Sequence, residues 1–181
     1  MKPENQLVEQ VLIARCQLRD RQALAELIER YERPVRYFIR RLVDNADLAD
    51  ELYQDTWLRV IRKIHTLGNP ERFTVWLYRI ARNRVYEEFR RKKKQVELDE
   101  SMEMAAPDHT EDELSSFEDA AKLHRCLEKL KPIHKEVLLL KFLEEMSYEQ
   151  IADVLDCNIG TVRSRIFHAK LALKKELEVS P

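Results

Sequence analysis

The stretch WLYRIARNRVYEEFRRKKK, residues 76–94, contains neither glycine nor proline. Its apolar residues recur every three or four positions, which is the period of a helix that buries one face. The predicted buried stripe consists of Leu77, Ile80, Ala81, Val85 and Phe89. The whole chain has only two glycines and is rich in Leu, Glu, Arg and Lys, so the same preference extends beyond this stretch. The sequence therefore predicts an all-α fold.

A second face of this predicted helix alternates aromatic rings, cations and an amide. It consists of Trp76, Arg79, Asn83, Tyr86 and Arg90. Rings stack on unpaired bases, guanidinium groups contact phosphates, and an amide can pair with one base edge. The pattern is typical of a surface that holds a single nucleic-acid strand. An ordinary amphipathic helix, with Trp76 in the core and a solvated basic end, accounts for the same spacing, so this helix alone leaves both interpretations open.

Charge is strongly segregated along the 181 residues, although the formal net charge is only −1. Residues 76–94 hold eight Arg or Lys and two Glu, whereas residues 96–119 hold ten Asp or Glu and no Arg or Lys. Residues 158–175 hold five Arg or Lys and no acid. The acidic stretch lacks an apolar period and contains Pro107, as a flexible linker does. The predicted organisation is a helical domain at 1–94, an acidic flexible linker at 95–116 and a second helical domain at 117–181.

Several function classes are disfavoured by what the sequence lacks. The three cysteines are far apart and have no CxxC pairing, which favours reduced thiols in the cytoplasm over a disulfide framework or a metal site. The N-terminus has no signal-peptide core, and no apolar run approaches the ~18 residues of a membrane span. No carboxylate pair, activated nucleophile or glycine-rich phosphate loop stands out. We expect a cytoplasmic protein without membrane contact, cofactor, metal or enzymatic activity.

Three helices are predicted ahead of the basic one. The first, at 7–17, would bury Leu7, Val11 and Leu12, and the second would run from a cap at Asp20 to Leu42. The third, at 46–64, would end at Gly68 as a left-handed cap. Its predicted buried residues are Tyr53, Trp57, Val60, Ile61 and Ile64, and its opposite face carries Asp47, Glu51, Gln54, Asp55, Leu58 and Arg62. Leu58 is either an ordinary surface leucine or the anchor for a protein partner.

The C-terminal domain has the pattern of a helix-turn-helix. Pro132 suits the first turn of a helix, and Ser147 and Gln150 have the spacing of a capping box. A glycine-containing turn at 156–160 precedes a final helix that Thr161 caps or opens. Its predicted core residues are Val162, Ile166, Ala169, Leu171 and Leu173, and its outward residues are Thr161, Arg163, Ser164, Arg165, Phe167, His168 and Lys170. Such a helix is suited to the major groove of DNA.

Two sets of motifs together resemble a known family. LAELIERYERPV, DLADELYQDTWLRV and FTVWLYRIARNRVYEEFRR, within 24–94, are similar to the promoter-melting region 2 of bacterial sigma factors. LKPIHKEVLLLKF, EEMSYEQIADVL and IGTVRSRIFHAKLAL, within 127–177, are similar to their region 4. The chain resembles the sigma-70 superfamily in its small extracytoplasmic-function group over nearly its whole length. It shows no counterpart of the long regulatory region or the intermediate domain of primary sigma factors.

The resemblance implies roles for particular residues. The polymerase β′ clamp helices would be contacted by Asp50, Glu51, Gln54, Asp55, Trp57 and Leu58. The melted −10 strand would be captured by the segment 67–83, with Arg79, Asn83 and Trp76 as the first candidates and Arg82 and Tyr86 as the next. The helix at 161–170 would recognise the −35 element in duplex form. The implied partners are core RNA polymerase, through its β′ and β subunits, promoter DNA and an anti-sigma factor, and the linker would thread toward the catalytic centre.

The sequence departs from the family pattern at one DNA-facing position. Sigma factors of this group more often have Arg where this chain has His168, and a histidine is only partly charged near neutral pH. The runner-up interpretation is a one-component regulator that joins an N-terminal helical sensing domain to a helix-turn-helix. It accounts for residues 161–175 but gives no purpose to the basic aromatic helix or to Leu58.

Overall fold

The computed structural model describes residues 3–98 and 118–179, which form helices joined by short connections and contain no strand. They fall into two compact units, one within residues 1–103 and the other within 104–181. This confirms the predicted all-α class with two helical domains. The predicted linker begins at 95, but the fourth helix continues to Leu98. The rest of that linker, 99–116, lies outside the described residues.

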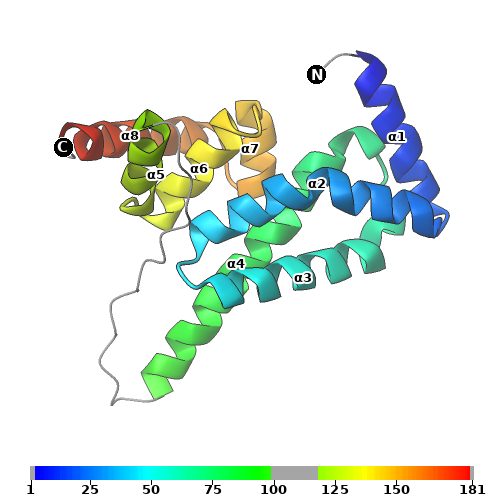
Figure 1. Ribbon diagram of the computed structural model, residues 1–181, viewed down its shortest axis with the longest axis horizontal. Helices are drawn as coiled ribbons and strands as arrows, with labels where there is room; N and C mark the ends of the chain where they lie inside the picture. Colours follow the sequence, from blue (N-terminus) through cyan, green and yellow to red (C-terminus); the bar gives the residue numbers. More distant parts are fainter. Residues whose placement is uncertain (1–2, 99–117, 180–181) are drawn as a thin grey trace. The chain divides into compact units, whose positions relative to one another are not determined.

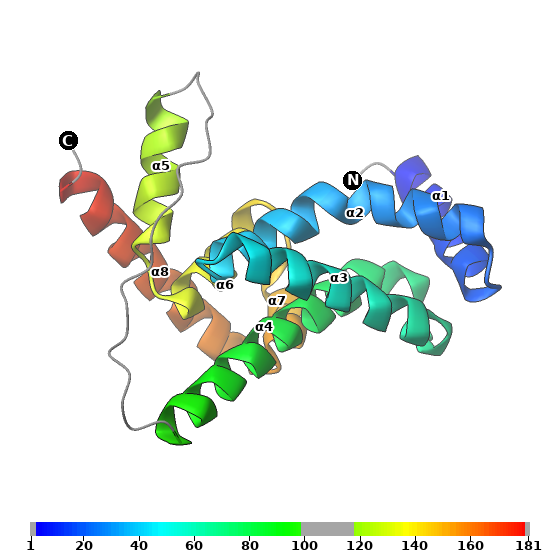
Figure 2. The same ribbon diagram turned by 60° about the horizontal axis from the view of Figure 1, so that its bottom comes forward.

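Within residues 3–98, the first unit has four α-helices and two short 3₁₀ turns (Figure 1). These are α1 (Pro3–Gln17), α2 (Arg21–Leu42), α3 (Ala46–Lys63), η1 (Ile64–Thr66), η2 (Pro70–Arg72) and α4 (Phe73–Leu98). Helix α2 packs against α1, α3 and α4, and α3 also packs along α4 (Figure 2). The rings of Phe38 and Tyr78 meet edge to face in the core, with centroids 5.1 Å apart. Helix α4 is thereby held on two sides.

Short-range caps begin two helices of this unit, and the one at Asp20 is as predicted. The Asp20 carboxylate accepts hydrogen bonds from the backbone N–H groups of Gln22 and Ala23 and so begins α2. The side chain of Asn45 accepts from the N–H of Leu48 and begins α3 in the same way. Each cap satisfies N–H groups that have no partner within the helix.

The predicted faces of two helices need correction. In α1, Leu12 is buried as expected, but its buried neighbours are Ile13 and Cys16, whereas Leu7 is 63% exposed and Val11 is also exposed. Helix α1 has apolar residues on two opposite sides, so its period alone does not choose the side that packs on α2. In α3 the predicted core residue Ile61 is 41% exposed.

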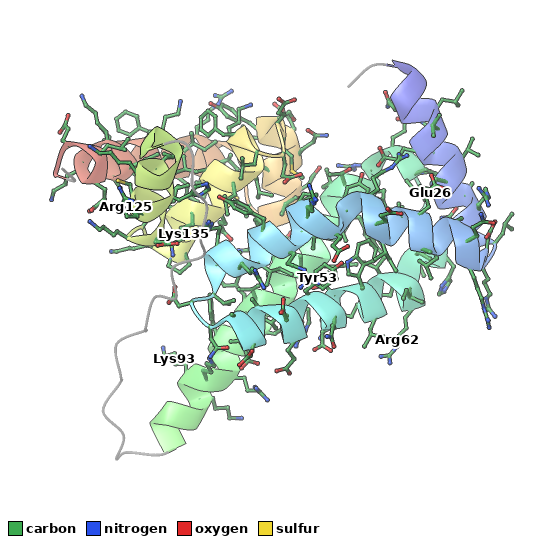
Figure 3. All side chains as sticks on the ribbon, in the orientation of Figure 1. Glu26, Tyr53, Arg62, Lys93, Arg125 and Lys135 are labelled. Atoms are coloured by element: carbon green, nitrogen blue, oxygen red, sulfur yellow. The ribbon has the colours of Figure 1, made fainter. Side chains whose placement is uncertain are left out.

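Helix α4 also differs in detail from its predicted stripe. Leu77, Ala81 and Val85 are buried as expected, while Ile80 and Phe89 are only half-buried. Tyr78, which the stripe omitted, is fully buried beside Phe38 of α2. Helix α3 likewise has a buried and an exposed side, since Tyr53 lies between helices and Arg62 projects outward (Figure 3). The buried side of α4 is therefore broader than a five-residue stripe, because α2 and α3 both cover it.

The second unit consists of α5 (Glu118–Glu128), α6 (Pro132–Phe142), α7 (Tyr148–Leu155) and α8 (Ile159–Val179). Helices α5, α6 and α7 all pack on α8. Pro132 occupies the first turn of α6, as predicted. The capping box is also confirmed, since the Ser147 hydroxyl accepts from the Gln150 N–H at 3.2 Å and the Gln150 side chain accepts from the Ser147 N–H at 2.8 Å.

Neither glycine has the role that the sequence predicts. Gly68 is not left-handed, because neither glycine has a positive φ, and the chain leaves α3 through η1 instead. In the helix-turn-helix the left-handed residue is Asp156, with φ of 54°, while Gly160 lies inside α8. Asn158 supplies the cap, since its Oδ1 accepts from the Thr161 N–H at 2.7 Å. Helix α8 therefore begins before Thr161, which was expected to cap or open it.

Candidate nucleic-acid and polymerase interfaces

One face of α4 is accessible and carries the side chains predicted to hold a single strand. Arg79 and Asn83 are exposed, and Trp76, Arg82 and Tyr86 are half-buried. The Trp76 ring packs against Phe73 with centroids 5.9 Å apart, which holds the ring in place. The indole therefore has both a packed side and a solvated side. This does not match the alternative in which Trp76 is an ordinary core residue.

The rings and cations of this face are also arranged in pairs. The guanidinium carbon of Arg82 lies 4.4 Å from the centroid of the Tyr86 ring, a cation–π arrangement. Tyr86 in turn packs edge to face against Phe89, with centroids 5.6 Å apart. Two rings with a fixed orientation and exposed donors between them are suited to stacking bases and to contacting phosphates.

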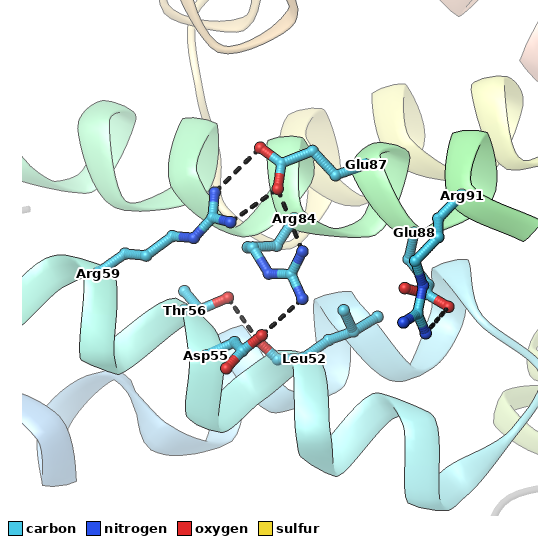
Figure 4. A network of polar contacts seen from close by, with 8 residues as sticks. All are labelled: Leu52, Asp55, Thr56, Arg59, Arg84, Glu87, Glu88 and Arg91. Carbon is cyan, nitrogen blue, oxygen red and sulfur yellow. Dashed lines mark hydrogen bonds and ion pairs between the residues drawn. The ribbon is translucent and has the colours of Figure 1, made fainter.

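The flank of α4 next to this face is joined to α3 by a network of ion pairs (Figure 4). Arg84 contacts Asp55 Oδ2 through Nη2 at 2.5 Å and Glu87 Oε2 through Nη1 at 3.1 Å. Arg59 donates two hydrogen bonds to Glu87, at 3.0 and 2.7 Å. The hydrogen bond from Arg59, more than that from Arg84, lowers the pKa of Glu87 below its ordinary value. The network fixes α4 against α3 close to the strand-binding face.

The structure separates the six side chains predicted for polymerase docking into two groups. Asp55 contacts Arg84, and Asp50 contacts Arg36 at 2.9 Å. Trp57 is 4% exposed and lies in the core. These three residues support α3 from its inner side and its edges. Glu51, Gln54 and Leu58 remain on the exposed face, where Leu58 is 48% exposed.

The exposed face of α3 includes an apolar residue that the sequence assigned to the core. Ile61 lies three positions after Leu58, so the two side chains are neighbours on the helix surface. Together they form a small apolar ridge beside Glu51 and Gln54, which is suited to a protein partner with an apolar pocket. The spacing of Leu58 and Ile61 is the sequence signal that could have identified this pair.

The outward face of α8 carries most of the predicted duplex-contacting residues. Arg163, Ser164, Phe167, His168 and Lys170 are exposed. Thr161 is half-buried, and its hydroxyl donates to Asn158 Oδ1 at 3.0 Å. Arg165 turns toward α6, where its Nη1 lies 3.8 Å from Oε1 of the fully buried Glu136. Six of the seven positions thus lie at the surface or at its margin, and Arg165 is directed inward.

Family comparisons agree with this two-part geometry. Residues 27–95 match the sigma-70 region 2 model, and residues 120–173 match the sigma-70 region 4 model. The ECF RNA polymerase sigma-E factor of Haemophilus influenzae is 32% identical over 96% of this chain and 97% of its own length. The chain belongs to the sigma-70 family, in its extracytoplasmic-function group. Residues 27–95, within the first unit of this sigma factor, are therefore region 2 and not the sensing domain that the runner-up interpretation required.

Further relatives support the same assignment. The RNA polymerase sigma-H factor of Pseudomonas aeruginosa is 32% identical over 94% of both chains. Among solved structures, the sigma factor RpoE of Bartonella quintana, crystallised with the anti-sigma factor NepR, has a TM-score of 0.70 at 25% identity. That match covers 87% of this sigma factor and 98% of RpoE. CnrH, solved with the cytosolic domain of CnrY, shares the fold, with a TM-score of 0.67 and 23% identity over 96% of this chain and 99% of CnrH.

Membership of the family establishes the general function. This sigma factor is a transcription initiation factor that directs RNA polymerase to promoters, and its region 4 is a DNA-binding helix-turn-helix. No helix within residues 3–98 and 118–179 is long and apolar enough to cross a membrane. The same residues contain no cluster of three side chains that could hold a metal ion.

Proposed function

We propose that this sigma factor docks on core RNA polymerase through α3, captures the melted −10 strand with α4 and recognises the −35 element with α8. The observation that carries the proposal is the accessible face of α4. Exposed Arg79 and Asn83 lie there between aromatic rings, while the adjacent flank of α4 is fixed to α3. Catalysis belongs to the polymerase, and this factor supplies recognition and strand separation in the cytoplasm.

Strand capture uses the two half-buried rings and the polar groups between them. Bases of the opened strand stack on Trp76 and Tyr86, each stack contributing about 1–3 kcal/mol. Arg79 and Arg82 contact phosphates, and Asn83 presents its amide to a base edge. Because Trp76 and Tyr86 already pack against Phe73 and Phe89, little rotamer freedom is lost when a base binds.

Docking uses the exposed part of α3 against the β′ clamp helices. Leu58 is the apolar anchor, and Glu51 and Gln54 provide register against a basic partner. Asp50, Asp55 and Trp57 act indirectly in this proposal, because their contacts within the unit keep the helix in place.

Duplex recognition uses the exposed N-terminal half of α8. Arg163, Ser164, His168 and Lys170 contact phosphates and base edges in the major groove, and Thr161 lies at the helix start. Arg165 stabilises the helix against α6 through Glu136. Phe167 is exposed beside His168, with ring centroids 5.4 Å apart, and supplies an apolar contact for a thymine methyl.

Three further contacts follow from the family rather than from the described residues. An anti-sigma factor binds the free protein and holds it inactive, and the solved complex of RpoE with the anti-sigma factor NepR supports such a partner. The acidic segment at 95–116 approaches the catalytic centre, and the β subunit is a second contact on the polymerase. The two polymerase contacts require the polymerase complex for their test.

In vitro transcription with core polymerase on a genomic fragment library tests the proposal and reveals the promoters. We expect transcripts only when the sigma factor is present, starting downstream of shared −35 and −10 elements. Replacing Arg79 and Asn83 by Ala should impair open-complex formation more than binding of the −35 duplex. Equal loss on both probes would refute the assignment of α4 to the melted strand.

A further inference from the structure

The polar side of α1 holds the segment that connects α3 to α4. Gln17 Nε2 donates one hydrogen bond to the Leu67 carbonyl at 2.7 Å and another to the Ile64 carbonyl at 3.1 Å. Gln10 Nε2 donates to the Glu71 carboxylate at 3.0 Å. One short helix thus contacts the connecting segment at two separate points.

A third contact fixes the end of the segment where α4 begins. The Tyr31 hydroxyl donates to the Glu9 carboxylate of α1 and lies 2.9 Å from the Thr74 hydroxyl. Glu9 and Tyr31 are both buried, and burial followed by the contact with Glu9 raises the pKa of Tyr31 well above its ordinary range. The Tyr31 ring packs on Phe73 with centroids 5.3 Å apart. Tyr31 of α2 therefore anchors the entry to α4, and α1 supports it through Glu9.

The connecting segment has little regular structure of its own. Residues 64–72 contain only the short turns η1 and η2, whose closing hydrogen bonds run from the Leu67 N–H to Ile64 and from the Arg72 N–H to Asn69. Turns of this length are only marginally stable without contacts to the rest of the protein. His65, Thr66, Gly68 and Asn69 are nevertheless exposed, so the segment presents an open surface on a fixed base.

We propose that Gln17 is a positioning residue for recognition of the −10 strand. Its amide bridges two backbone carbonyls and so sets the path of residues 64–72, which lead directly into the strand-binding face of α4. The inference rests on the proposed function of α4. It adds that α1, although it contributes no side chain to the strand-binding face, determines how well the sigma factor distinguishes a correct −10 sequence from a substituted one.

The test compares Gln17→Met with Gln6→Met in the holoenzyme. Methionine is similar in length to glutamine but lacks the N–H donors, and Gln6 is an exposed residue of the same helix. Open-complex formation is measured on a promoter from the transcription library and on derivatives substituted at single −10 or −35 positions. Losing two hydrogen bonds should reduce the fraction of molecules in which residues 64–72 follow the path needed for strand capture. We therefore expect −10 discrimination, the ratio of open-complex formation on the original promoter to that on its −10 derivatives, to fall about fivefold to tenfold.

Other readouts separate positioning from a general loss of structure. Gln17→Met should leave the affinity for core polymerase and discrimination at −35 unchanged. In the free protein, hydrogen exchange should accelerate at the amides of Leu67 and Arg72 but not in the middle of α2. Gln6→Met should match the wild type in every measurement.

Three outcomes would overturn the inference. Unchanged −10 discrimination in Gln17→Met, with strand capture lost in Asn83→Ala, would refute the role of Gln17 and leave the proposed function standing. Equal losses at −10, at −35 and in polymerase affinity would show that Gln17 only stabilises the fold. If Asn83→Ala also retained normal strand capture, the proposed function of α4 would fail, and this inference with it.

Discussion

Leu58 offers the most direct test of the polymerase-docking surface. Full burial of a leucine side chain contributes about 1.5–3 kcal/mol. Leu58 is 48% exposed in the free protein, so the part that remains for a partner to cover is worth about 1 kcal/mol. Leu58→Ala should therefore weaken core-polymerase binding about fivefold. Leu58→Asp should weaken it more than about 100-fold, because an unpaired carboxylate would be placed in an apolar contact.

The fold should tolerate both changes, since the side chain lies on the outer face of α3. Asp in place of Leu within a helix costs less than about 1 kcal/mol of intrinsic propensity. The matched control is Leu18→Asp, which introduces the same charge at a residue that is 84% exposed just beyond α1. It should bind core polymerase as the wild type does.

Binding is measured by titrating labelled sigma factor with core polymerase, and folding by circular dichroism and urea denaturation. Wild-type affinity for a properly folded Leu58→Asp variant would refute docking through α3. An equal loss for Leu58→Asp and Leu18→Asp would show that added negative charge, not this surface, causes the effect.

Four further predictions concern stability, thiol reactivity and DNA binding. Glu87→Gln should lower the free energy of unfolding by about 1 kcal/mol at pH 7. The pKa of Glu87 in the folded protein lies below its unfolded value of 4.5, so the difference in stability from wild type should vanish as the pH falls from 4.5 through the folded pKa. Urea titrations measure the difference, with Glu29→Gln as the control. Ser147→Ala should cost the second unit about 1 kcal/mol in urea unfolding through loss of the capping box. Burial raises the pKa of the Cys16 thiol from 9.0 to about 11, so its alkylation by iodoacetamide at pH 8 should be at least about 100-fold slower in the native protein than in urea, and equal rates would contradict its burial. Arg163→Ala should weaken duplex −35 binding and reduce the slope of log affinity against log salt by about 1, and an unchanged slope would argue against a phosphate contact.

The signals that predicted helix boundaries act over a few residues. The cap at Asp20, the first-turn Pro132 and the box formed by Ser147 and Gln150 each join groups within four positions, so the sequence contains all the information that they need. The glycine predictions failed because glycine permits a left-handed conformation but does not require one. An aspartate can also adopt the left-handed conformation, and Asp156 does so while Gly160 lies within α8.

The choice of buried face depends on contacts that are distant in sequence. Helix α1 offers Leu7 and Val11 on one side and Ile13 and Cys16 on the other, and only packing against α2 decides between them. Ile61 was misassigned because it lies at the margin of the apolar stripe of α3, next to the outward face that contains Leu58.

The candidate site shows the same limit. Exposure of Arg79 and Asn83 on α4 was predictable from helical spacing alone. The pairing of Asp55 with Arg84 was not, because these residues are 29 positions apart and meet only when α3 packs on α4. The contacts of Gln17 with Ile64 and Leu67 span 47 and 50 positions and have no local signature. The side chains exposed on α4 could therefore be predicted from the sequence, but the long-range contacts that hold α4 and its preceding segment in place could not.

The ion-pair network gives a physical reason why docking and strand capture can cooperate. Arg84 is mostly buried and contacts Asp55 of α3 and Glu87 of α4, while Arg59 holds Glu87 in a two-point contact. Bidentate pairs fix orientation as well as distance, so α3 and α4 should move together as one body. If α3 docks as proposed, the polymerase thereby also sets the orientation of Arg79 and Asn83.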